Sequence, residues 1–397
     1  MKYICLNFKV HQPLRLRIFP FFDIGASHYN DDATNESFIK RIADNCYLPA
    51  NNIILDLINK YNGQFKVSYS ISGTAIDQFK IYSPEVIESF RILAQTGCVE
   101  FTAQTYSNSL AVLKDNMEFS RQVMAQSELI KTLFGKRPTT FSNSEFVYSN
   151  EIATLVANLG YTTILTEPTN QIRNSENLKS TYRNTTNPSL IILLNNTCLS
   201  DDIALRFLDA DRYGLFLTAQ KYVSRLINTS QHDRIVNLSI NYETFGERLS
   251  YSTGIFEFLA SLPTLILRNT DFEFINPCEG AKHCNSISEL IIPYTETRTD
   301  PDYSVWLGNE LQQQAFEKLY RLSAIVSKSD DPFILKDWQY LQTRDHFYYM
   351  NSKYFSRDFS QSSYNPYNNP YQAFMNYMKI LSDFSIRVTK TKVKGPY

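Results

Sequence analysis

Residues 235–247 have the sequence IVNLSINYETFGE, which predicts a buried β-strand that ends in a polar turn. Apolar residues dominate its first half, as in strands covered on both faces, and Gly246 marks the turn. Side chains alternate along a strand, so Asn241 and Glu243 are expected to face the same way. The carboxyl ends of strands carry the active site in parallel α/β proteins, so both are expected to face one pocket. An aspartate at position 241 would complete an acid/base pair there, and activity therefore depends on this one residue.

The composition is that of a large globular protein with balanced charge. The 397 residues suffice for one large α/β domain or two ordinary ones. Lysine and arginine total 39 and aspartate and glutamate total 40, so the net charge is -1. Proteins that bind a phosphate backbone normally carry a basic excess, so nucleic acid is not an expected partner. Aromatic residues make up 14% of the chain, and those that the core does not use would suit the flat apolar faces of sugar rings.

The sequence gives no indication of export or of membrane insertion. The first apolar run is too short for a signal peptide and is interrupted by Lys9 and His11. No uninterrupted apolar stretch reaches the length that spans a bilayer, so a membrane is not an expected partner. The six cysteines are scattered, and Cys5 and Cys98 lie in strand-like runs where buried free thiols are common. We expect a cytoplasmic protein.

One cluster, formed by Cys278, His283 and Cys284, contains residue types that bind metals. Structural zinc needs four ligands, and no second pair occurs at zinc-finger spacing, so an irregular loop is the favoured interpretation. The sequence also lacks the glycine-rich loops that hold nucleotide phosphates and the HExxH motif of zinc proteases. We therefore predict no metal site.

Short apolar segments alternate with helical segments over the first 300 residues, and this alternation predicts a parallel sheet or barrel. Strands are expected at residues 3–10, 65–71, 98–102, 139–143, 161–165, 190–194 and 234–241. A helical segment at 36–61 is expected to be interrupted near Pro49. Further helices are expected at 306–326, 333–350 and 371–384. This change of pattern predicts a barrel domain over 1–300 and a helical C-terminal region over 301–397.

Three polar side chains in or after these strands are candidates for chemistry. His11 and Glu145 each follow a strand, at the end where active sites form. Position alone favours a simpler interpretation of both, as a hydrogen-bonded loop histidine and an ion-paired glutamate. Glu100 stands among apolar neighbours inside the third strand, and a buried acid needs either a partner or a function.

Six segments occur in the order of the motifs of glycoside hydrolase family 57, which the chain resembles from residue 1 to about residue 384. They are MKYICLNFKVHQPLRLR, GCVEFTAQTYSNSL, FSNSEFVYSN, INYETFGER, WLGNELQQQAFEKLY and LQTRDHFYYM. The family contains α-amylases and 4-α-glucanotransferases, and the chain looks closest to its short bacterial α-amylase-like members. The resemblance implies a (β/α)7 barrel, an incomplete TIM barrel, with a helical C-terminal region. It also implies a retaining mechanism on an α-glucan or malto-oligosaccharide, with no metal and no cofactor.

The resemblance also implies roles for residues of this chain. Glu145 matches the nucleophile of the family, and Asn241 stands where the family has its general acid/base aspartate. The other matching residues are expected to bind substrate: His11, Glu100, Glu243 and Asp345, with His346 beside the last.

The departures from the family pattern lie at polar pocket positions. Asparagine has nearly the shape of aspartate but cannot protonate a leaving group, a contribution of about 10²–10⁴-fold to the rate. Gln104, Asn108 and Ser142 stand where an acid, a histidine and an arginine are frequent. The frame segments FFDIG, CYLPAN and DHFYYM are kept. This pattern predicts a family member whose chemistry is lost or altered.

Three functions remain open on the sequence. The first is a catalytically impaired α-amylase-like protein, a pseudoenzyme that still binds α-glucan. The second is an active hydrolase or 4-α-glucanotransferase in which Glu243 or Asp345 donates the proton. The family has both acids beside its aspartate, which weakens this alternative. The third is a non-catalytic interaction protein whose groove no longer binds sugar.

Overall fold

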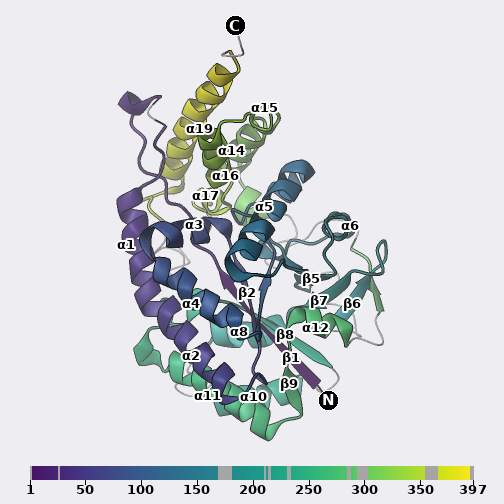
Figure 1. The fold of residues 1–397 in the computed structure, drawn as a ribbon. Helices are drawn as coiled ribbons and strands as arrows, with labels where there is room; N and C mark the ends of the chain where they lie inside the picture. Colours follow the sequence, from purple (N-terminus) through teal and green to yellow (C-terminus); the bar gives the residue numbers. More distant parts are fainter. Residues whose placement is uncertain are drawn as a thin grey trace.

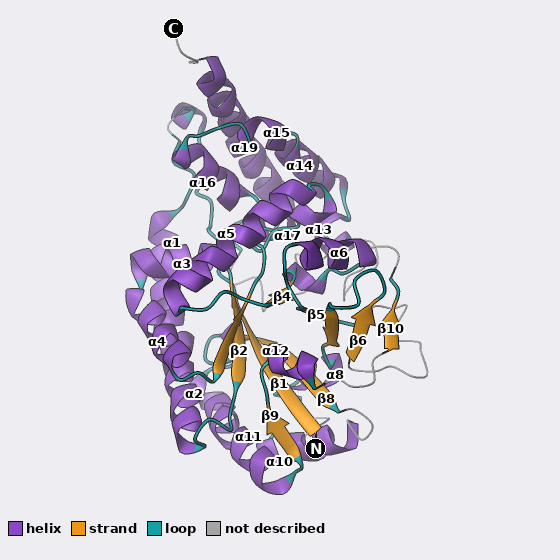
Figure 2. Ribbon diagram, turned by 45° about the vertical axis from the view of Figure 1, so that its right-hand side comes forward, coloured by secondary structure: helices purple, strands orange, loops and turns teal. Residues whose placement is uncertain are grey.

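The computed structural model describes residues 2–25, 27–168, 181–209, 212, 216–229, 234–283, 288–292, 303–353 and 365–393. Within these residues most strands lie at the centre with helices around them, β6 (Thr181–Asn184) and β10 (Ser288–Leu290) lie at one side, and a further group of helices lies at one end (Figures 1 and 2). No helix in this part of the chain is both long enough and apolar enough to cross a bilayer.

The first sheet is built around β1 (Lys2–Val10), which pairs in parallel with three neighbours. Its order is β3-β2-β1-β8, and β9 pairs with the amino end of β1. The bounds are β2 (Val67–Ile71), β3 (Val99–Thr102), β8 (Ile235–Asn241) and β9 (Phe272–Phe274). The register places Lys9 beside Asn241, so β1 and β8 end at the same edge of the sheet.

The second sheet has the order β10-β6-β7-β5-β4. Its bounds are β4 (Thr140–Ser142), β5 (Thr163–Thr166), β6 (Thr181–Asn184), β7 (Ile191–Leu194) and β10 (Ser288–Leu290). The strands β4, β5 and β7 pair in parallel, whereas β6 is antiparallel to β7.

Two single bridges connect the sheets. Ala103 pairs with Phe141 just beyond the end of β3, and Asn195 pairs with Asn237 of β8. The described chain therefore has seven parallel strands that follow one another around a barrel axis. They are β1, β2, β3, β4, β5, β7 and β8. The (β/α)7 architecture predicted from the sequence is confirmed, one strand short of the eight-fold barrel. The short strands β6, β9 and β10 were not predicted.

Helices cover the outside of the barrel (Figure 2). They are α1 (Asp32–Ile42), α2 (Leu48–Lys60), α3 (Gly73–Tyr82), α4 (Pro84–Gln95), α5 (Asn116–Phe134), α6 (Asn150–Asn158), α8 (Thr197–Ala204), α10 (Ala219–Thr229), α11 (Ile255–Asn269) and α12 (Pro277–Lys282). Short 3-10 turns lie at η1 (Phe21–Asp23), η3 (Ala111–Leu113), η4 (Ser144–Phe146), η5 (Tyr242–Thr244) and η6 (Tyr251–Thr253). Polar caps start several helices: the Ser72 side chain, for example, accepts the N–H of Ala75 at the start of α3.

The expected interruption near Pro49 takes the form of a π-helical turn, η2 (Ala43–Tyr47), between α1 and α2. Pro49 lies in the first turn of α2 and has no N–H to donate to the carbonyl of Asn45 four residues earlier. A wider turn tolerates the missing bond, so the chain passes from α1 to α2 without a break.

The helical C-terminal region comprises α13 (Ser304–Leu307), α14 (Glu310–Tyr320), α15 (Ser323–Val326), α16 (Pro332–Leu341), α17 (Asp345–Tyr348) and α19 (Pro370–Val393). The two helices expected at 306–326 and 333–350 are thus divided, whereas the third is longer than expected. Trp338 and Phe384 of this region belong to the same hydrophobic core as Phe119 and Phe141 of the barrel. The division at residue 300 stays a prediction, because this core extends across it.

Candidate active site

A polar pocket of about 900 Å³, its open mouth included, lies between the carboxyl ends of the strands and the helical C-terminal region. Five residues expected in a common site line it: His11, Glu145, Asn241, Glu243 and Asp345. The three other positions that depart from the family pattern, Gln104, Asn108 and Ser142, line it too.

Glu145 lies in η4, directly after β4. Its φ is +47° and that of Phe146 is +55°, a left-handed conformation that costs a non-glycine residue about 1–3 kcal/mol. The carboxylate lines the pocket, pairs with the guanidinium of Arg344 and remains 31% exposed. Backbone strain of this kind is concentrated at active sites, and here it accompanies a carboxylate that lines the pocket.

Asn241 is the last residue of β8 and is exposed to the pocket. Its side chain makes no hydrogen bond to any described residue. Glu243, two residues later, is buried, and its Oε1 accepts the hydroxyl of Tyr47 at 2.6 Å and the backbone N–H of His11 at 3.3 Å. Burial raises the pKa of Glu243, although these hydrogen bonds oppose the rise. The strand end therefore presents a free amide beside a restrained carboxyl group.

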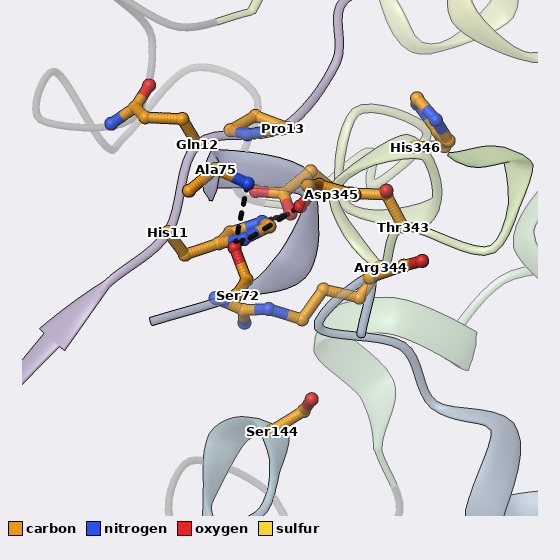
Figure 3. A network of polar contacts seen from close by, with 12 residues as sticks. His11, Gln12, Pro13, Ser72, Ala75, Ser144, Thr343, Arg344, Asp345 and His346 are labelled. Carbon is orange, nitrogen blue, oxygen red and sulfur yellow. Dashed lines mark hydrogen bonds and ion pairs between the residues drawn. The ribbon is translucent and has the colours of Figure 1, made fainter. Parts of the chain in front are cut away.

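The imidazole of His11 joins two elements of the pocket (Figure 3). Its Nδ1 lies 2.8 Å from the Ser72 hydroxyl, and its Nε2 lies 3.0 Å from Oδ2 of Asp345. Burial alone would raise the pKa of Asp345, but the charges and hydrogen bond of its neighbours, His11 first, hold it below its usual range. Although serine, histidine and aspartate are aligned, Ser72 is fully buried and caps α3, so its hydroxyl is no nucleophile.

Glu100 does not line the pocket, and its expected location is corrected. It lies inside β3 rather than at its end, where the Thr140 hydroxyl donates to Oε1 at 2.5 Å and the Cys278 N–H donates to Oε2 at 3.0 Å. Burial raises the pKa of Glu100. This partly buried acid thus has partners deeper in the barrel, because its position in the strand puts it below the rim.

His346 also lies outside the pocket lining, and its expected location is corrected in the same way. Its Nε2 lies 3.3 Å from the carbonyl of Tyr340, its ring packs near Tyr377, and it points away from His11 in Figure 3. Burial lowers its pKa to about 4, so the ring is neutral at pH 7. Adjacent residues of a helix face different directions, so Asp345 reaches the pocket and His346 does not.

The cysteine–histidine cluster falls partly outside the described residues, because Cys284 is among those not described. His283 stacks on Tyr3, with 4.9 Å between the ring centroids. The part of the chain that is described contains no group of three histidine, cysteine or acidic residues able to hold a metal ion.

Three cationic residues of the pocket were not identified from the sequence: Lys9, Arg248 and Arg344. Lys9 had a usable signal, because it stands near the end of the strand that leads into His11, two positions before it, and side chains two apart along an extended chain face the same way. The other two follow turns whose course the sequence pattern does not specify.

Comparison with known families identifies the family of the chain that forms this pocket. Residues 5–292 match the model of glycosyl hydrolase family 57. The chain belongs to this family. It is also 33% identical over 409 residues to a Methanocaldococcus jannaschii protein named "Putative alpha-amylase", covering 99% of this chain and 86% of that protein.

Solved structures support the fold assignment to family 57. A branching enzyme of the family from Thermococcus kodakaraensis, solved with glucose, matches with a TM-score of 0.69 and 13% identity, covering 98% of this chain and 90% of that one. The 4-alpha-glucanotransferase of Thermococcus litoralis matches with a TM-score of 0.63 and 14% identity. That match covers 87% of this chain but 56% of the longer enzyme.

Proposed function

We propose that this family 57 protein binds α-glucans in the pocket and hydrolyses them weakly or not at all, because an amide occupies the position of the general acid/base. The observation that carries the proposal is that Glu145 and Asn241 line one pocket from the ends of β4 and β8. The names of the relatives, an α-amylase, a glucanotransferase and a branching enzyme, support the substrate class.

The chemistry of a retaining glycosidase explains the expected defect. Such an enzyme uses two carboxyl groups about 5–5.5 Å apart, one to attack the anomeric carbon and one to protonate the leaving oxygen. Glu145 retains the first capability. Asn241 can donate a hydrogen bond to the glycosidic oxygen but holds no titratable proton, so the sugar would have to leave as an unstable alkoxide.

A second candidate is an active α-glucan hydrolase or 4-α-glucanotransferase that takes its proton from Glu243. The raised pKa of this residue favours the idea, because a general acid must be protonated near neutral pH. Its burial and its hydrogen bond with Tyr47 oppose it. Asp345 is a poorer acid still, since its pKa lies below its usual range.

The substitution Asn241→Asp tests the proposal. Restoring a group that can hold a proton should raise the release of reducing ends from starch and malto-oligosaccharides at least about 10²-fold, with a bell-shaped dependence on pH. Glu145→Gln in the Asn241→Asp background should abolish the gain, and Asn241→Ala should show none. Robust hydrolysis by the wild type, little altered in Asn241→Asp, would instead favour the second candidate.

Binding separates both candidates from a non-catalytic interaction protein. Calorimetric titration of the wild type with maltotriose to maltoheptaose should show weak saturable binding, since several convergent polar groups can fix sugar hydroxyls. Flat titrations with folded protein would mean that the groove no longer binds sugar.

A further inference from the structure

Lys9 is placed between the two reactive positions of the pocket. It pairs in register with Asn241, and parallel partners in register project to the same side of a sheet. Its ammonium lies 3.1 Å from the ring centroid of Phe146, the residue that follows Glu145. The positive charge is thus held at the pocket wall, next to both the amide and the turn that carries the carboxylate.

Arg248 adds a second positive charge at the same pocket. It follows η5, where its backbone N–H donates to the carbonyl of Glu243 at 2.9 Å. Its side chain is partly exposed and forms no ion pair with any described residue. The pocket carboxylates are engaged elsewhere: Glu145 with Arg344, and Asp345 with His11. The guanidinium of Arg248 is therefore available to an anionic ligand.

These cations and the amide at position 241 suit a particular leaving group. A sugar alkoxide needs a proton from the enzyme, whereas the monoanion of a phosphate ester carries its own. The second pKa of such an ester is about 6, so the monoanion makes up about half of the ester near pH 6 and a smaller share at pH 7. An aspartate at position 241 would repel that phosphate, and an asparagine can donate a hydrogen bond to it. Asparagine at position 241, which is proposed to disable glucan hydrolysis, thus does not prevent the departure of an anomeric phosphate.

We propose that the pocket accepts α-glycosyl phosphates as donors, with Lys9 and Arg248 binding the phosphate and Glu145 attacking the sugar. The inference deepens the proposed function, since it rests on the same pocket and nucleophile. A Glu145 oxygen forms a bond to the anomeric carbon, and the bond from that carbon to the phosphate oxygen breaks. Its electron pair leaves with the phosphate, which departs as HPO₄²⁻ and keeps its proton. Attack by HPO₄²⁻ on the glycosyl ester reverses the step.

Isotope exchange tests the step directly. Wild-type protein incubated with ³²P-labelled inorganic phosphate and α-glucose 1-phosphate or α-maltose 1-phosphate should transfer label into at least one sugar phosphate. Glu145→Gln should abolish the exchange, and Lys9→Met and Arg248→Gln should each lower it at least tenfold. Lys2→Met is the matched control, because Lys2 also lies over a phenylalanine ring but at the amino end of β1, and it should exchange like the wild type.

Asn241→Asp separates this inference from the proposed function, because it should lower the phosphate exchange at least tenfold while raising glucan hydrolysis. Exchange that is absent from the wild type with both donors would overturn the inference, and malto-oligosaccharide binding in the same preparation would leave the proposed function standing. Binding of glucose 6-phosphate as tight as that of glucose 1-phosphate, without exchange, would show a general sugar-phosphate site and also overturn it. Thermal melting of each variant excludes loss of folding as the cause.

Discussion

At the scale of single residues, the three carboxylates that line the pocket are each held by a neighbour. Arg344 pairs with Glu145, His11 contacts Asp345, and Glu243 accepts a hydrogen bond from a buried tyrosine. The side chain of Asn241 makes no such contact within the described residues. A ligand can therefore engage the amide without first breaking an internal bond, whereas it must compete with Arg344 for the carboxylate of Glu145.

Glu243→Gln should leave the protein at least as stable as the wild type at pH 7. The donors around it, the Tyr47 hydroxyl and the His11 N–H among them, need an acceptor but not a charge. The folded pKa of Glu243 is raised, so its contribution to stability is fully present below its unfolded pKa of about 4.3 and is lost as the pH rises through the folded value. The Glu243→Gln variant has no titrating group at this position, so it does not lose stability in this way as the pH rises.

Urea unfolding at pH 4 and pH 7 measures the effect, and the stability of the variant relative to the wild type should improve with pH. Glu243→Leu is the control, because it leaves the buried donors without an acceptor and should cost about 1–3 kcal/mol at both pH values. A Glu243→Gln protein that loses stability at pH 7 would show that the charge itself holds the turn.

The sequence predicted which polar residues stand at strand ends, but not how deep or in which direction each one points. Glu145 and His11 follow apolar strands and Asn241 ends one, so their places at the strand ends predicted that they lie at the rim. Glu100 lies within its strand, and His346 lies one residue after Asp345 in α17. Only the packed structure shows that both side chains point away from the pocket. The pairing of Glu145 with Arg344 joins residues far apart in sequence, which no local pattern reveals.

At the scale of elements, the turn η5 after β8 is held against the π-turn η2. The Tyr47 hydroxyl donates to Glu243, the Cys46 thiol donates to the carbonyl of Tyr242 at 3.2 Å, and the Tyr242 hydroxyl donates to Asn51 at 2.7 Å. The sequence segments CYLPAN and YETFG are thus one structural unit. Their contact fixes the direction in which Asn241 enters the pocket.

Gly246→Ala should disrupt this unit. Gly246 has a φ of +100°, and a Cβ there would lie 1.8 Å from the carbonyl oxygen of Asn45, which belongs to backbone and cannot swing aside. The clash should cost about 1–3 kcal/mol in addition to the strain of a left-handed alanine. Gly135→Ala is the matched control, because Gly135 has a φ of +84° with no atom within 4 Å of the added Cβ.

Thermal unfolding compares the two variants. Gly246→Ala should lower the melting temperature clearly more than Gly135→Ala, and it should also weaken sugar binding because η5 moves. Equal losses in the two variants would mean that the close approach to Asn45 is relieved without cost.

Continuous apolar runs made the barrel strands predictable, because strands that are buried on both faces consist mainly of apolar residues. The helix expected at 333–350 was only partly correct. It ends at Leu341, and Gln342 donates to Glu118 of α5 at 2.6 Å before α17 begins. After this break Asp345 faces the barrel. No proline or glycine stands at residues 341–345, so the sequence pattern contains no signal for it.

At the scale of the whole molecule, the barrel and the helical C-terminal region complete one pocket together. The two parts share a hydrophobic core, and polar contacts such as that between Gln122 and Gln342, at 2.9 Å, join them. His11 at the end of β1 contacts Asp345 of α17 across the same boundary. Ligand binding and the docking of the helical region should therefore be coupled.

Asp345→Asn should weaken that docking in a way that depends on pH. The folded pKa of Asp345 is lowered, so its ionised form stabilises the protein above the unfolded pKa of about 3.9, and this stabilisation is lost as the pH falls toward the folded value. Charged hydrogen bonds contribute about 1.5–3 kcal/mol, so the variant should lose roughly that amount at pH 7. At pH 3 the difference from the wild type should be smaller.

Asp337→Asn provides a control of opposite sign within the same helical region. Burial raises the pKa of Asp337, although Arg387 lies 2.7 Å away, so the wild type loses stability from this group as the pH rises. Urea unfolding from pH 3 to pH 7 should give a cost for Asp345→Asn that grows with pH and a cost for Asp337→Asn that shrinks. A cost of Asp345→Asn that stays constant over this range would mean that the contact with His11 contributes shape rather than charge to the joint between barrel and helices.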